Sequence, residues 1–135
     1  MIHLDTSFVI DYMREVSRKR IGPASAFLER LPGDEELAIS IFVLCELYSG
    51  AELSPRATGE RKRIEEVCAL LHIELPGGSF ALRYGKVLAA MHRKRNEIPA
   101  MDLLIATSAL ETESRLVSRN DKHFGKVPGL KMLTY

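Results

Sequence analysis

The sequence has few cysteines, no long apolar run and almost no excess of either charge. Lys and Arg number 19 against 18 Asp and Glu, which gives a net charge of +1, and cysteine occurs twice in 135 residues. The apolar runs are far shorter than the about 20 residues that cross a bilayer. A charge so close to zero provides no basic field over the whole surface. We therefore expect no membrane segment, and any contact with nucleic acid has to be local.

The two cysteines argue against a disulfide framework and against a zinc site. Cys45 and Cys68 both fall in apolar helical patterns, and their spacing is not that of metal ligands. We expect both to be buried free thiols in a reducing cytosol. Met1 leads directly into a predicted strand, so we expect no signal peptide and a cytoplasmic protein.

Several common catalytic motifs are also absent. The chain has no Gly-Lys-Ser/Thr phosphate loop, no His-Glu-x-x-His, no Gly-x-Ser-x-Gly and no Gly-x-Gly-x-x-Gly. These absences argue against a P-loop nucleotide hydrolase, a zinc protease with that helix motif, a serine hydrolase with a nucleophile elbow and a dinucleotide-binding fold. The four histidines are scattered along the chain, and His123 is the one that flanks an acid of interest, Asp121.

The chain does contain a regular alternation of short apolar segments and helical patterns. Its length is that of one domain, residues 1–135. This alternation predicts an α/β layer architecture with a mostly parallel sheet of four to five short strands. The predicted strands are residues 1–4, 36–40, 73–75, 115–118 and 130–135, and a loop is predicted at 119–125. The predicted helices are residues 8–13, 24–31, 41–50, 55–72, 80–95 and 100–110.

Four acids lie beside or inside apolar runs: Asp5, Glu46, Asp102 and Asp121. Taken singly, each is explained by a helix cap or a core ion pair. As a group they occupy positions where strands end or buried helices begin, and such positions converge on one crevice of a parallel sheet. The same apolar runs contain no Lys or Arg to neutralise them, and clustered carboxylates repel unless a cation intervenes. Oxygen ligands favour Mg²⁺ or Mn²⁺, and such a site suits hydrolysis of phosphodiesters.

The order and spacing of these motifs resemble the PIN-domain ribonucleases, specifically the VapC-type toxins. The resemblance covers essentially the whole chain. The residues that carry it are Leu4-Asp5-Thr6-Ser7, Glu46 within an apolar helix, Ile98-Pro99-Ala100-Met101-Asp102-Leu103-Leu104-Ile105-Ala106, Leu116-Val117-Ser118-Arg119-Asn120-Asp121-Lys122-His123-Phe124 and Val127-Pro128-Gly129-Leu130.

This resemblance implies a three-layer α/β/α PIN-like fold and a metal-dependent endoribonuclease. Asp5 and Asp102 match direct ligands of Mg²⁺, with Mn²⁺ as a substitute, and Glu46 matches the third acid. Asp121 is the acid available for the fourth place, although Asn120 could be the inner residue there. The resemblance also implies a homodimer and inhibition by a VapB-type antitoxin.

Other side chains have two interpretations. The hydroxyls of Thr6 and Ser7 either cap the first helix or hold substrate beside the metal. Apolar positions on the first helices either pack in the core or form a groove for an antitoxin helix: Phe8, Tyr12, Phe27 and Leu31. Three basic groups are either solvated helix ends or contacts for RNA backbone: Arg14, Arg18, Lys19 and Arg20; Arg61, Lys62 and Arg63; and Arg93, Lys94 and Arg95.

Two other functions compete with the ribonuclease. One is a PIN-like module that binds RNA or a protein partner without cutting, with its acids serving as caps. The other is a DNA-directed or structure-specific nuclease. Metal binding by the four acids favours an enzyme, and a comparison of RNA with DNA substrates separates the two nucleases.

Overall fold

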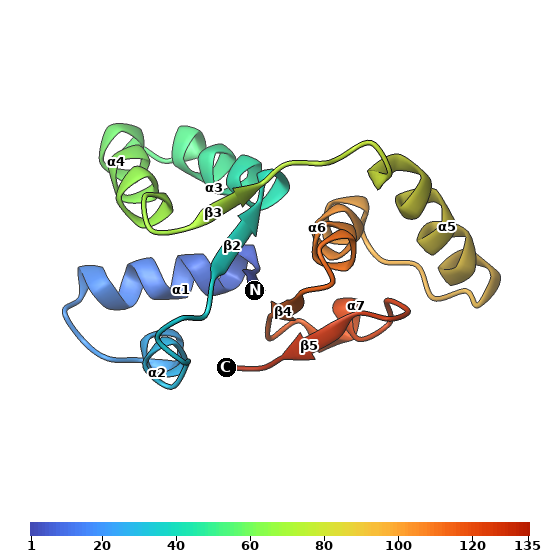
Figure 1. The fold of residues 1–135 in the computed structure, drawn as a ribbon. Coiled ribbons are helices and arrows are strands. Elements are labelled where there is room, and N and C mark those ends of the chain that lie inside the picture. The colour runs from blue at the N-terminus through green and yellow to red at the C-terminus, as the bar shows by residue number, and fades with distance from the viewer.

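The computed structural model describes residues 1–135 and contains one five-stranded sheet with helices on both faces (Figure 1). The strands lie in the order β3-β2-β1-β4-β5, and every pair is parallel. The strands are β1 Ile2–Leu4, β2 Leu37–Ser40, β3 His72–Glu74, β4 Arg115–Val117 and β5 Lys131–Leu133. The predicted α/β class with a parallel central sheet is confirmed.

Seven helices connect the strands. They are α1 Thr6–Ser17, α2 Pro23–Glu29, α3 Ile41–Leu53, α4 Ala57–Cys68, α5 Phe80–Arg93, α6 Ala100–Glu111 and α7 Asp121–Phe124. Figure 1 shows α1 to α4 on one side of the sheet and α5 to α7 on the other, so the domain has three layers. None of the helices is long and apolar enough to cross a membrane.

Strand β1 occupies the centre of the sheet. All three of its residues are buried, because helices cover both faces of a parallel sheet, and this explains its uncharged sequence. The chain leaves β1 toward β2 on one side, and it later returns to β1 on the other side as β4. The carboxyl ends of β1 and β4 therefore meet where the strand order reverses, which is the place where open α/β sheets bind ligands.

Aromatic rings hold α1 in the core. Phe8 packs edge-to-face against Phe27 of α2 and against Tyr135, with ring centroids 5.7 Å and 4.6 Å away. Phe8 and Phe27 are both buried, so core packing is their use.

Helix α6 is the most buried helix, as its apolar sequence predicts. It lies between the sheet and α5, and six of its residues are buried. Two of these are polar, and Thr107 and Ser108 satisfy their hydroxyls by donating to the carbonyls of Leu103 and Leu104. The helix therefore places Asp102, in its first turn, on a rigid element.

Three predictions about helices are wrong. Helix α3 is not buried all round, and Cys45 lies on its exposed face, although both cysteines are free thiols as expected. The segment 119–125 is not a loop, because Asn120 accepts a hydrogen bond from the backbone of His123 and starts the short helix α7. Helix α1 also continues to Ser17, where a polar connection was expected.

That longer helix carries a buried acid with a structural role. The Glu15 carboxylate accepts hydrogen bonds from the backbone of Ala24 at 3.0 Å and of Ser25 at 2.7 Å, which joins α1 to the start of α2. Burial raises the pKa of Glu15, but the hydrogen bonds of Ser25, Ala24 and Gly22 outweigh it and hold the pKa below its usual value. A Cβ at Gly22 would lie 2.3 Å from Glu15 Oε1, so a larger residue there would displace the Glu15 carboxylate from its hydrogen bonds.

His3 is the buried histidine of the central strand. Its Nε2 contacts Thr112 Oγ1 at 3.1 Å, while Nδ1 has no hydrogen-bond partner. Burial is the main cause that lowers the pKa of His3 to about 4. His3 is therefore neutral in the folded protein at neutral pH.

The pH dependence of stability should reveal this histidine. The unfolded chain binds a proton near pH 6.5 and the folded one only near pH 4, so stability present above pH 6.5 is lost as the pH falls toward 4. Between pH 7 and pH 5 the wild-type protein should lose about 2 kcal/mol more than His3→Leu. Urea denaturation of both proteins at several pH values measures this, and parallel curves would contradict it.

Candidate active site at the carboxyl edge of the sheet

Asp5 follows β1 directly and is buried, with 3% of its surface exposed. It is the cap of α1, because its Oδ1 accepts a hydrogen bond of 2.8 Å from the backbone N–H of Phe8. Its other oxygen, Oδ2, accepts a hydrogen bond from the Ser118 hydroxyl at the end of β4. Asp5, and not Thr6 or Ser7, is therefore the helix cap.

The charge of Asp5 is poorly compensated. Burial raises the pKa of its carboxyl, and the nearby negative charge of Asp102 raises it further, while the hydrogen bonds from Ser118 and Phe8 act in the opposite direction. No Lys or Arg forms an ion pair with Asp5, Asp102 or Glu46. Such a site favours a cation.

Asp102 reaches this edge from the first turn of α6. Its Oδ2 lies 2.6 Å from Nδ1 of His123 on α7. The Asn120 side-chain nitrogen lies 3.0 Å from the same Nδ1. One ring nitrogen either donates a proton or accepts one, so His123 bonds to Asp102 or to the Asn120 amide but not to both at once.

Glu46 reaches the site from α3 through Thr6. The Thr6 hydroxyl donates a 2.6 Å hydrogen bond to Glu46 Oε1. Thr6 follows Asp5 in the sequence, so this contact holds the third acid beside the end of β1. Ser7 is exposed, and its hydroxyl has no partner within the protein.

Asn120 and Asp121, the two candidates for the fourth site residue, lie in different surroundings. The Asn120 backbone N–H donates to the Ser118 hydroxyl at 2.9 Å, which ties Asn120 to the same network as Asp5. Asp121 is exposed and turns along its own helix, where a Cβ at Gly125 would lie 2.7 Å from its Oδ1. The structure therefore brings Asn120 into the network and leaves Asp121 outside it.

Two members of this network are not among the site residues predicted from sequence. Ser118 is buried and joins Asp5 to Asn120, and His123 contacts Asp102. The signal for His123 is its spacing of three residues from Asn120, which places both on one face of a helix. Predicting a loop at 119–125 hid this spacing.

The donor atoms suit Mg²⁺ or Mn²⁺, since Asp5, Asp102 and Glu46 offer carboxylate oxygens that are not paired with Lys or Arg. In this arrangement no three His, Cys, Asp or Glu side chains lie close enough to hold one ion. In the structure Glu46 is hydrogen-bonded to Thr6, and Asp102 lies 2.6 Å from His123 Nδ1.

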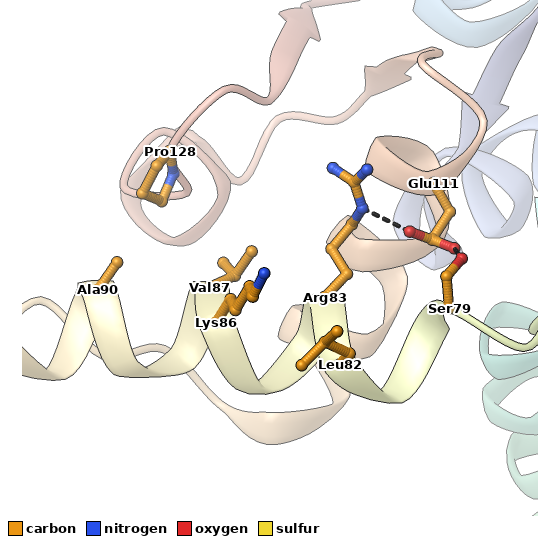
Figure 2. A pocket seen from close by; sticks show the side chains of 8 residues that line it. All are labelled: Ser79, Leu82, Arg83, Lys86, Val87, Ala90, Glu111 and Pro128. Carbon is orange, nitrogen blue, oxygen red and sulfur yellow. Dashed lines mark hydrogen bonds and ion pairs between the residues drawn. The ribbon is translucent and has the colours of Figure 1, made fainter.

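A wide hollow of the surface lies elsewhere. It measures about 450 Å³, and α5, the last residue of α6 and Pro128 line it (Figure 2). Figure 2 shows Ser79 and Arg83 reaching Glu111 at one end of this hollow. None of the predicted site residues lines it, and its acid is already paired with Arg83. Its size alone gives no reason to place chemistry there.

Comparison with known proteins agrees with this geometry. The PIN domain family matches residues 2–130. "Ribonuclease VapC19" of Mycobacterium tuberculosis is 30% identical over 132 residues, which cover 95% of each chain. "Ribonuclease VapC2" of Rickettsia felis is 30% identical over 103 residues, covering 76% of this chain and 77% of the relative.

Solved structures show the same fold. VapBC2 from Rickettsia felis, bound to a DNA fragment from its promoter, contains a chain that superposes with a TM-score of 0.90 and 26% identity, covering 100% of this chain and 99% of that one. VapBC-1 from nontypeable Haemophilus influenzae gives a TM-score of 0.83 at 24% identity, covering 99% and 98% of the two chains. The second likeness concerns the fold alone.

A parallel sheet in this strand order, with acids gathered where the order reverses, is the architecture of a PIN domain. The chain belongs to the PIN-domain family and, within it, to the VapC ribonucleases. The resemblance inferred from the sequence is therefore confirmed.

Ser118 is testable through a pair of variants of nearly equal shape. Ser118→Val should be less stable than Ser118→Thr by about 1–3 kcal/mol, because Val leaves the Asn120 N–H without a buried acceptor and removes a donor from Asp5. Both variants add the same methyl group, so their difference isolates the hydroxyl. Urea denaturation at pH 7 measures the difference in stability between the two variants. Equal midpoints would show that the Ser118 hydroxyl does not stabilise the protein.

Proposed function

We propose that the protein is a VapC-type endoribonuclease that hydrolyses RNA phosphodiester bonds with the help of a divalent cation. The observation that carries this proposal is the buried Asp5 carboxylate beside Asp102, with no Lys or Arg to neutralise either. The ribonuclease names of relatives at 30% identity support it.

Each site residue has a role in this proposal. Asp5, Asp102 and Glu46 would hold the ion, and a bound Mg²⁺ or Mn²⁺ would offset charge on the phosphate and make water a better nucleophile. Phe8 N–H and Ser118 fix the Asp5 carboxylate. Thr6 orients Glu46, and the unpartnered Ser7 hydroxyl donates to a phosphate oxygen of the substrate.

His123 and Asn120 complete the proposed site on α7. His123 positions Asp102, and the Asn120 amide is released toward the substrate whenever His123 bonds to Asp102 instead. Asp121 supplies negative charge to this corner from its exposed position, as an outer acid.

The proposed partners are a VapB-type antitoxin and a second copy of this chain. The solved relative from Rickettsia felis is a VapBC2 complex, which supports an antitoxin partner. A small, wholly apolar hollow of about 70 Å³ between α1, α2 and the end of α4 is a suitable seat for an antitoxin side chain. Tyr12 lines it, and Leu70 lines it with 79% of its surface exposed.

Asp5→Asn should abolish RNA cleavage and leave the fold intact. Asn caps helices as well as Asp and keeps an acceptor for Phe8 N–H, but it loses the charge that binds the ion. We expect cleavage of single-stranded RNA in Mg²⁺ to fall by about 100-fold or more, since even an outer partner of a metal site is worth 10–100-fold. Excess chelator should stop the wild-type protein equally.

Asp34→Asn is the matched control, because Asp34 is an exposed acid without a hydrogen-bond partner. Full activity of Asp5→Asn, or of the wild-type protein in chelator, would rule out metal-dependent hydrolysis. Absence of Mg²⁺ binding by calorimetry would favour a non-cutting RNA- or protein-binding module. Faster cleavage of DNA than of RNA would favour a DNA-directed nuclease.

Substitutions of Asn120 and Asp121 test which of the two is the fourth site residue. Asn120→Ala should lower the rate by about 10-fold or more, because Asn120 belongs to the network around Asp5 and Asp102. Asp121→Asn should lower it only a few-fold, since an exposed charge acts weakly through solvent. Initial cleavage rates at saturating RNA measure both, and the reverse order would make Asp121 the inner residue.

A further inference from the structure

We propose that Arg119 binds a phosphate of the RNA beside the phosphate that is cleaved. This inference rests on the proposed function, since it concerns how the substrate of that site is held. Arg119 lies between Ser118 and Asn120, which both belong to the network around Asp5. It is not a member of the three basic groups that the sequence suggested as contacts for RNA.

The backbone of Arg119 lies at the carboxyl edge of the sheet. Ser118, which precedes it, donates from its hydroxyl to Asp5, and the N–H of Asn120, which follows it, donates to the same hydroxyl at 2.9 Å. The guanidinium reaches the first half of α1, where Nη1 lies 3.7 Å from Asp11 Oδ2. Asp11 comes only about 9 Å along the helix axis after Asp5. Contacts at both ends of the side chain therefore place Arg119 next to the proposed site.

Tyr135 supports the guanidinium. Its ring centroid lies 4.4 Å from Arg119 Cζ, and its carbonyl oxygen lies 3.4 Å from Arg119 Nε. The ring is itself fixed, because its hydroxyl donates to Asp11 Oδ2 at 2.7 Å and because it packs edge-to-face on Phe8, with centroids 4.6 Å apart. The backbone N–H of Phe8 is a donor to Asp5. A continuous series of contacts therefore joins the guanidinium to the buried acid through Tyr135 and Phe8.

Part of the guanidinium remains free. The Arg119 side chain is 49% exposed, and its Nη2 forms no hydrogen bond or ion pair within the protein. Nη1 is near enough to Asp11 for an ion pair but too far for a hydrogen bond. The N–H donors on Nη1 and Nη2 are therefore unused, and this planar fork matches two oxygens of a phosphate.

Arg115, at the other end of β4, shows how an arginine with a structural role differs. Its Nη2 donates to Glu35 Oε2 at 3.0 Å, so the fork of this guanidinium is used within the protein. The Arg115 side chain is 43% exposed, which is close to the exposure of Arg119. The two arginines therefore differ in whether their donors are used, and hardly in how exposed they are.

The side-chain charges around Asp11 also favour an anion. Arg14 Nη1 lies 4.0 Å from Asp11 Oδ1, while Arg119 pairs with the other oxygen. Two exposed guanidinium groups therefore share one carboxylate. A phosphate that binds there gains positive partners, while the neighbouring phosphate approaches the acids of the site. Because Tyr135 already orders the Arg119 side chain, binding costs little side-chain entropy.

The experiment compares Arg119→Gln with Arg115→Gln, a matched control on the same strand. Binding of a mixed-sequence single-stranded RNA is followed by fluorescence anisotropy over a KCl series, with Asp5→Asn present in every protein to prevent cleavage. Cleavage rates over a range of RNA concentrations are measured in the same variants without Asp5→Asn. Melting temperatures of all the proteins show whether each variant folds.

Arg119→Gln should lower the slope of log affinity against log salt by about 0.7, which is the contribution of one phosphate contact on a single strand. Its KM and its dissociation constant for RNA should each rise about tenfold, because a charge-assisted hydrogen bond is lost. The kcat should stay the same, since the contact holds substrate and transition state alike. Arg115→Gln should match the parent protein in slope and in KM. Equal slopes and equal KM values for the two variants would overturn the inference.

Asp11→Asn separates RNA binding from a purely structural role of Arg119. Asn keeps an acceptor for the Tyr135 hydroxyl but removes the negative charge that competes with phosphate for the guanidinium. Asp11→Asn should therefore bind RNA about twofold to fivefold more tightly, whereas Arg119→Gln binds it more weakly. Effects of the two substitutions on RNA binding that are equal in direction and size would mean that Arg119 only ties β4 to α1, and would overturn the inference.

Failure of the proposed function would give a different result. If the wild-type protein cuts no RNA in Mg²⁺ or Mn²⁺, the proposed function fails, and the salt slopes still decide whether Arg119 binds RNA. If the wild-type protein cuts RNA and Arg119→Gln matches it in slope and in KM, the proposed function stands and the role of Arg119 is wrong.

Discussion

The site is organised around the buried carboxylate of Asp5, which is held by two neutral donors and faced by another acid. The Phe8 N–H and the Ser118 hydroxyl orient Asp5 but do not neutralise it, and Asp102 opposes its ionisation. A buried charge without a counter-charge is costly. Glu15 shows the contrast, because its hydrogen bonds satisfy it fully and it serves only to join two helices.

Several elements of the fold hold the Asp5 carboxylate in place at the carboxyl edge of the sheet. Strand β1 is buried on both faces, so the position of Asp5 is rigid, and β4 supplies Ser118 from the adjacent strand. Helices α3, α6 and α7 then bring Glu46, Asp102 and Asn120 from distant parts of the chain. The acids repel RNA unless a cation is present, which is why the proposed function depends on a bound metal ion.

Much of the fold could be predicted because buried segments are recognisable in the sequence as runs without charged residues. The uncharged run before Asp5 indicated a central strand, and the apolar run around Asp102 indicated a covered helix. The prediction was wrong for Cys45 and for residues 119–125. An apolar helix does not reveal which of its sides faces solvent, and a one-turn helix has too few residues for periodicity to show.

The sequence by itself determined the class of the fold, the order of its elements and the acids that interrupt apolar runs, because apolar segments must be buried and an acid among them stands out. Only the tertiary structure decided that Ser118 and His123 join the network and that Asp121 turns away from it. These facts depend on how helices run relative to one another, and that direction follows from contacts between residues far apart in the chain.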